Sequence, residues 1–248
     1  MTFVIGAANL LIGCVYTGYG FMTLADLKRG WRELGPSHFG MAWLFMAFTC
    51  GPHHLMHAAH IAAGRTPGGL EALAVIIGIP PGLTWFLLRI EALRGGPGDR
   101  PIAGTPRWLK AAGLIYSLYV IVFVAVVVSV VRDGTSFVPR LTPNVLLVAL
   151  YVAIGYYLLR SQLAAHRAGD DWSLSGLCLS AVFPTCAAMH AAFLLYAVNG
   201  RYGTDPHLLV IDWLSVPAAG YFVWVVRCLY RGTLPDWNLR TEPAPLRV

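Results

Sequence analysis

The chain has 248 residues, of which 57% are hydrophobic and only 12% are charged, and its mean hydropathy is +0.62. A soluble domain is about 25% charged, so this composition excludes a disordered chain and argues against a water-soluble globular domain. The net charge of +6 does not indicate a nucleic-acid partner. The basic residues occur in short segments between apolar stretches, where membrane topology normally places them.

Seven apolar stretches follow one another along the chain, each close to the roughly 20 residues that a transmembrane helix needs. The predicted spans are residues 3–25, 41–63, 70–93, 109–131, 143–163, 174–198 and 207–230. Glycine, proline and charged residues separate them, for example at Lys28-Arg29-Gly30 and Gly64-Arg65-Thr66-Pro67. The sequence therefore predicts an all-α fold, a seven-transmembrane helix bundle that forms a single integral-membrane domain over residues 1–248 and contacts the lipid bilayer.

The basic residues predict the orientation of this bundle. Of the 18 Lys and Arg residues, all but Arg65, Arg132, Arg140 and Arg201 fall on one side of the predicted spans. Basic residues accumulate on the cytoplasmic side, so we expect the N-terminus outside the cell membrane and the C-terminus in the cytoplasm. The bundle could act as a homo-oligomer or as a subunit of a membrane complex.

The two ends of the chain resemble each other when the sequence is shifted by about 135 residues. The matched residues are Asn9 with Asn144, Tyr16 with Tyr151, Cys50 with Cys186, His54 with His190 and Pro80 with Pro217. This pattern predicts a 3+1+3 parallel internal repeat, with halves at residues 3–93 and 143–230 and a linking helix at residues 109–131. Repeats of this kind place functional sites at the interface between the halves.

Five of the eight histidines lie inside predicted spans, where ionisable groups are costly and rarely face lipid. Four of them, His53, His54, His57 and His60, are in the second span, and His190 is in the sixth. At about 100° per residue, Cys50 and these four histidines fit within a helical arc of about 120°. Cys186 is one turn from His190. We therefore expect Cys50 and His54 to face Cys186 and His190 across the repeat axis.

Two thiols and two imidazoles form a soft ligand set, which favours copper(I) and is also compatible with zinc. Met56 and Met189, which flank the set in sequence, favour copper. The predicted ligands are Cys50, His54, Cys186 and His190, with His53, His57 and His60 as further ligands or an access path and Asp212 as a carboxylate that orients an imidazole. Imidazoles alone would instead suit iron, zinc or the axial positions of a haem.

The second predicted span also carries a family resemblance. The segment Phe48-Thr49-Cys50-Gly51-Pro52-His53-His54-Leu55-Met56 resembles the second transmembrane helix of the ethylene receptors, which carries a Cys-Gly-x-x-His motif that binds copper(I). The resemblance implies that Cys50 and His54 are copper ligands. It covers about ten residues, and the second copy, Cys186-Ala187-Ala188-Met189-His190, lacks the glycine.

Three functions are compatible with these features. The first is a metal-binding membrane protein with a role in sensing, metal handling or redox chemistry. The second is a haem- or iron-binding membrane oxidoreductase or electron-transfer subunit, and the third is a transporter with a histidine proton relay near Asp212 and Glu71. The seventh span contains no lysine, which excludes a retinal Schiff base. The sequence leaves open whether the protein is an enzyme.

Overall fold

The structure is a computed structural model that describes residues 2–132, 141–199 and 206–236. Four of the arginines used above to predict the orientation, Arg140, Arg201, Arg240 and Arg247, lie outside the described residues. The orientation in the membrane therefore stays a prediction.

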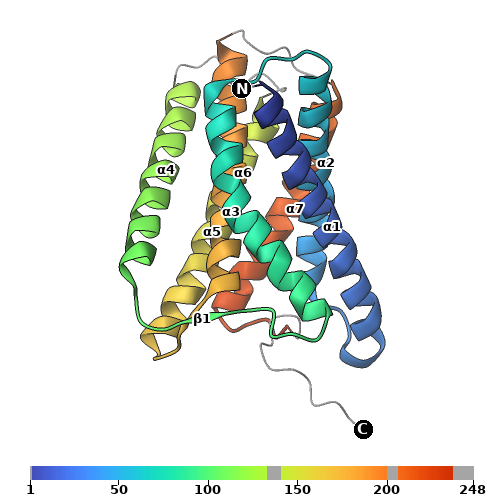
Figure 1. Cartoon of the computed structure of the whole chain (residues 1–248), viewed down its shortest axis with the longest axis vertical. Helices are drawn as coiled ribbons and strands as arrows, with labels where there is room; N and C mark the ends of the chain where they lie inside the picture. The colour runs from blue at the N-terminus through green and yellow to red at the C-terminus, as the bar shows by residue number, and fades with distance from the viewer. Residues whose placement is uncertain (1, 133–140, 200–205, 237–248) are drawn as a thin grey trace.

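The described residues form seven long helices, which confirms the all-α fold (Figure 1). They are α1 (Thr2–Leu34), α2 (His38–Ala62), α3 (Gly69–Leu93), α4 (Arg107–Arg132), α5 (Thr142–Arg167), α6 (Leu174–Val198) and α7 (Pro206–Tyr230). Each helix contains or closely matches one predicted span. The sequence did not predict the short antiparallel ladder between β1 (Pro101–Ile102) and β2 (Trp172–Ser173), which joins two of the connecting loops.

Six of the helices, all except α2, are long and apolar enough to cross a membrane. The molecule is thus helical and has the composition of a membrane protein. Helix α2 is 25 residues long, the same length as α3, but five histidines lower its mean hydropathy. It packs between α1 and α7, and its passage through the membrane remains a prediction.

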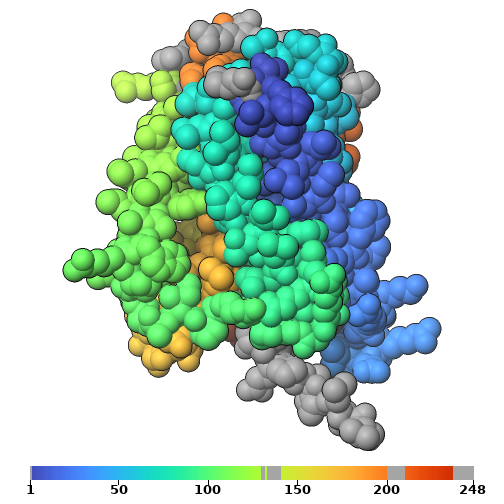
Figure 2. Space-filling view, viewed as in Figure 1, coloured from blue at the N-terminus to red at the C-terminus, as the bar shows by residue number. Residues whose placement is uncertain are grey.

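The helices pack in a paired arrangement. Helix α1 contacts α2 and α3, while α5 contacts α6 and α7; across the molecule α2 packs on α7 and α3 packs on α6. Helix α4 lies at the edge, against α6, and Figure 2 shows it beside α3 on one face. Most of its large apolar side chains are exposed, among them Leu114, Ile121 and Val128, so this surface is suited to contact with lipid.

The first helix is longer than its predicted span. The charged segment Lys28-Arg29-Gly30, predicted to end the helix, continues as helix to Leu34. The prediction was wrong because a charged turn ends an apolar span without breaking the helix, and Lys, Arg and Leu are good helix formers. The helix ends where Gly35 adopts a φ of +74° just before Pro36, a combination that stops helices.

Gly51 lies at a very close approach between α1 and α2. A Cβ atom at Gly51 would lie 2.9 Å from the backbone nitrogen of Thr17 and would also collide with its hydroxyl oxygen. On the facing helix, a Cβ at Gly13 would meet the side chain of Leu55 at 2.7 Å. The glycine of the Cys-Gly-x-x-His segment therefore has a packing role, because it lets α1 come within reach of the histidines of α2.

Gly51→Ala is expected to lower the free energy of unfolding by about 1–3 kcal/mol, because the backbone of Thr17 cannot move aside as a flexible side chain can. This loss should exceed the helix propensity that alanine gains over glycine. Thermal denaturation of the purified protein in detergent measures the effect. The matched control is Gly113→Ala in α4, where an added Cβ meets nothing within 4 Å. Equal stability of the two variants would contradict the close approach.

Candidate metal centre

A cavity of about 10 Å³ lies where α2 and α6 face each other, with room for roughly one water molecule or ion. Its lining residues are Cys50, His53, His54, His57, Cys186, Met189 and His190. The structure thus brings the histidines and cysteines of the two predicted spans around one cavity, as expected from the helical period and the repeat.

Three of the predicted residues, His60, Met56 and Asp212, do not line this cavity. His60 is half-buried one turn closer to the end of α2, at the edge of the predicted arc. Met56 lies about 120° around the helix from Cys50, on a different face, and is also half-buried outside the lining. Of the two methionines expected near the metal, only Met189 is at the cavity.

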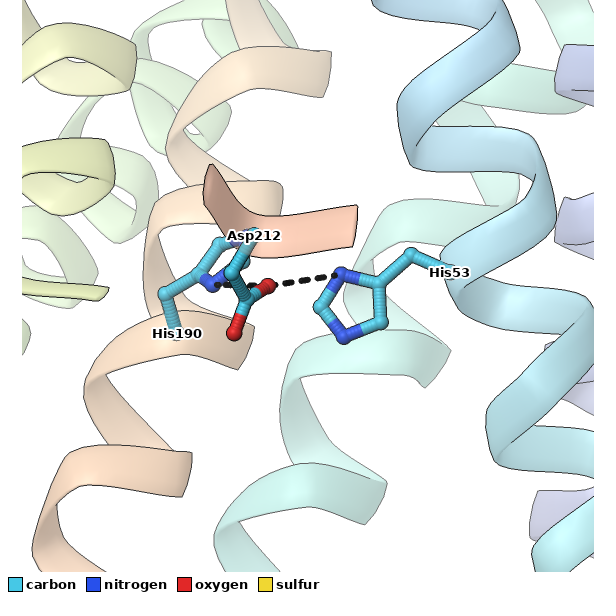
Figure 3. A group of neighbouring side chains, drawn as sticks. All are labelled: His53, His190 and Asp212. Carbon is cyan, nitrogen blue, oxygen red and sulfur yellow. Dashed lines mark ion pairs between the residues drawn. The ribbon is translucent and has the colours of Figure 1, made fainter. Parts of the chain in front are cut away.

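Three potential metal ligands come together from α2, α6 and α7, namely His53, His190 and Asp212 (Figure 3). One ligand atom from each residue lies within 4.8 Å of the other two, and no other group of three or more His, Cys, Asp or Glu residues within the described part of the chain meets this distance. Oδ1 of Asp212 is 3.5 Å from Nδ1 of His53 and 3.8 Å from Nδ1 of His190. Asp212, predicted to orient an imidazole, is therefore placed among the donors themselves.

The carboxylate of Asp212 is buried and only partly hydrogen-bonded. Its residue is 2% exposed, and Oδ2 accepts a hydrogen bond of 2.8 Å from Nδ2 of Asn144. No donor reaches Oδ1 within the described part of the chain. Leaving an anionic oxygen buried without a partner costs several kcal/mol, so this position favours a cation.

Two asparagines fix the imidazoles of His54 and His190. Because the amide nitrogen of Asn9 donates to the carbonyl of Ile5, Oδ1 of Asn9 accepts the Nδ1–H of His54 at 2.9 Å. In the same way Oδ1 of Asn144 accepts the Nδ1–H of His190 at 2.6 Å. In both histidines the lone pair is thereby on Nε2. A hydrogen bond from the other ring nitrogen is the usual support of a metal-binding histidine.

The two thiols are hydrogen-bond neighbours of each other, and each also has a tyrosine from the opposite half of the chain beside it. The hydroxyl of Tyr151 is 3.3 Å from Sγ of Cys50, and Tyr16 is a hydrogen-bond neighbour of Cys186. These tyrosines match each other in the internal similarity, but no role for them was predicted from the sequence. Their spacing was a usable signal, since each lies seven residues, two helical turns, after the asparagine on its own helix.

A chain of hydrogen bonds leads from the cavity to the end of α2. Arg65 pairs with Glu71 through contacts of 2.6 and 3.0 Å, and its NH2 group donates to Nδ1 of His57 at 2.8 Å. Neutral His57 then carries its proton on Nε2 and donates it to Nε2 of His53 at 2.9 Å. Arg65 and Glu71 thus form an ion pair that is connected to the histidine cluster.

Comparisons with protein-family models, curated proteins and solved structures give no match. The chemistry of the site therefore rests on its own residues. Two imidazoles and one carboxylate form the donor set of many zinc and non-haem iron sites.

Proposed function

We propose that this protein is a membrane protein that binds a divalent first-row transition-metal ion between α2, α6 and α7. The ligands are His53, His190 and Asp212. The observation that carries the proposal is the buried Oδ1 of Asp212, which no hydrogen-bond donor among the described residues reaches and which lies 3.5 and 3.8 Å from the Nδ1 atoms of two imidazoles. Charged groups inside a membrane are rare and usually functional.

The donor set favours iron(II), zinc or copper(II) at this position. Copper(I) remains a prediction for the thiols of Cys50 and Cys186, which lie at the same cavity but have tyrosine hydroxyls as neighbours. The volume of about 10 Å³ suits a single ion rather than a porphyrin, which supports an ion over haem.

The proposal includes the 3+1+3 repeat as its architecture. Support comes from the helix packing, in which every contact between α1, α2 and α3 has a counterpart between α5, α6 and α7. The ring of Tyr16 lies 5.8 Å from that of His54, and the ring of Tyr151 lies 5.5 Å from that of His190. The halves differ at the metal site, because the positions matched to His53 and Asp212 are Met189 and Val75.

Elemental analysis of protein purified from native membranes tests the proposal. We expect close to one equivalent of a transition metal per chain, released by a strong chelator. Cys50→Ser and Cys186→Ser should retain the metal, because neither thiol belongs to the proposed set. Loss of the metal from both variants would show that the thiols are the metal ligands. A metal-free wild-type protein would contradict the proposal.

The hydrogen-bonded chain favours a second candidate function, a proton relay. Successive donors lead from Arg65 through His57 to His53, whose other ring nitrogen, Nδ1, lies 3.5 Å from Oδ1 of Asp212. Such a relay needs no metal. The finding of no metal in the analysis above would therefore favour the relay.

A further inference from the structure

The histidine cluster has a second arrangement of metal-type ligands, His57 and Glu71, at the end of α2 near Arg65. We call it the outer site and the site of His53, His190 and Asp212 the inner site. Nδ1 of His57 and Oε1 of Glu71 lie 3.4 Å apart. The NH2 nitrogen of Arg65 lies 2.8 Å from the first atom and 2.6 Å from the second. A cationic nitrogen thus bridges an imidazole lone pair and a carboxylate oxygen.

The burial of these groups indicates a built site rather than a surface ion pair. The side chains of His57 and Glu71 are only 5% and 4% exposed, whereas that of Arg65 is 21% exposed. Arg65 belongs to the connection between α2 and α3, where Gly64 adopts a φ of +102°. The ligands are therefore fixed by two helices, while the arginine approaches them from a loop.

We propose that His57 and Glu71 form a second divalent-cation site and that Arg65 closes it as a tethered cation. The site lies next to the inner one, because Nε2 of His57 is 2.9 Å from Nε2 of His53. An ion that displaces Arg65 binds first to His57 and Glu71. This deepens the proposed function by giving the inner site a gated access path, although the second site itself does not require the inner one.

Arg65 also constrains the inner ligand His53. While Arg65 donates to Nδ1 of His57, the proton of neutral His57 stays on Nε2 and is donated to His53. Nε2 of His53 is occupied in that state. Withdrawal of Arg65 leaves Nδ1 of His57 open to the incoming ion, which then lies one hydrogen-bonded imidazole away from the inner ligand His53.

Cobalt(II) titration of the purified full-length protein, followed by equilibrium dialysis and visible absorption, tests this inference. With one inner site, the wild-type protein is expected to bind one equivalent. Arg65→Gln should bind two, and the double variant Arg65→Gln/Glu71→Gln should return to one. Arg65→Lys keeps a cation at the position and should remain at one. The control is Arg32→Gln, an exposed arginine in the last turn of α1.

The outcomes separate the two proposals. If the wild-type protein binds no cobalt and Arg65→Gln binds one equivalent, the inner site is refuted and the gated outer site is supported. If Arg65→Gln binds no more cobalt than the wild-type protein, the outer site is overturned. Arg65→Met, which keeps the aliphatic stem, provides the same comparison if the glutamine variant does not fold.

Discussion

Asp212→Asn is expected to abolish tight metal binding and, in the same protein, to raise the thermal stability of the metal-free form. Both effects have one cause. The carboxylate is 2% exposed, and its Oδ1 has no donor among the described residues. With a metal ion present, this oxygen is a charged ligand; with none, it is a buried anion that lacks a partner. An asparagine keeps the shape but removes the charge.

We expect the metal affinity of Asp212→Asn to fall by at least about 100-fold, the upper end of the loss seen when only an outer hydrogen-bond partner of a ligand is removed. Without metal, relief of the unpaired charge should add about 1–3 kcal/mol to the free energy of unfolding. For a chain of this size, this corresponds to a rise of about 2–10 °C in melting temperature. Dialysis against the metal and melting curves with and without chelator measure the two effects.

The control for Asp212→Asn is Glu33→Gln, which removes an acidic group from an exposed position in the last turn of α1. It should leave both quantities unchanged. A ligand role for Asp212 would be disproved if Asp212→Asn bound metal as the wild-type protein does. If the metal-free variant melted at a lower temperature than metal-free wild type, the carboxylate would instead be a stabilising part of the fold.

The helices could be predicted from sequence because apolar runs of membrane length need no tertiary information. The end of α1 could not be predicted in this way, because the helix continues beyond the apolar run to Leu34. The two-residue ladder of β1 and β2 also escaped prediction. It depends on two loops, near Pro101 and Trp172, that are distant in sequence and meet only in the folded chain.

The convergence of the histidines was predictable because it follows from helical period and internal similarity alone. The choice of donors was not. The positions of Cys50 and Cys186 agree with the prediction, and the two thiols are hydrogen-bond neighbours of each other, but each also has a tyrosine from the opposite half as a neighbour. Asp212 belongs to α7, outside the two segments whose cysteine and histidine pattern predicted the site, and its nearness to His53 depends on the packing of α2 on α7. Such contacts between helices that are distant in sequence leave no pattern within one segment.

Asn144→Ala and Asn9→Ala form a matched pair whose comparison decides which ligand set binds the metal. Each asparagine is fully buried and accepts the Nδ1–H of one histidine, His190 or His54. Asn144 has a second role, because its amide nitrogen also donates to Oδ2 of Asp212. If His53, His190 and Asp212 are the ligands, Asn144→Ala loosens two of them and Asn9→Ala loosens none.

We therefore expect Asn144→Ala to weaken metal binding by about 10- to 100-fold, and Asn9→Ala to bind metal within about twofold of the wild-type protein. Both variants should lose similar stability, about 1–3 kcal/mol, because each leaves a buried imidazole N–H without an acceptor. Competition with a chelator of known affinity measures the binding, and melting curves measure the stability. Equal weakening in the two variants would assign the metal to His54 and His190 together, the pair expected from the repeat, and would exclude the set centred on Asp212.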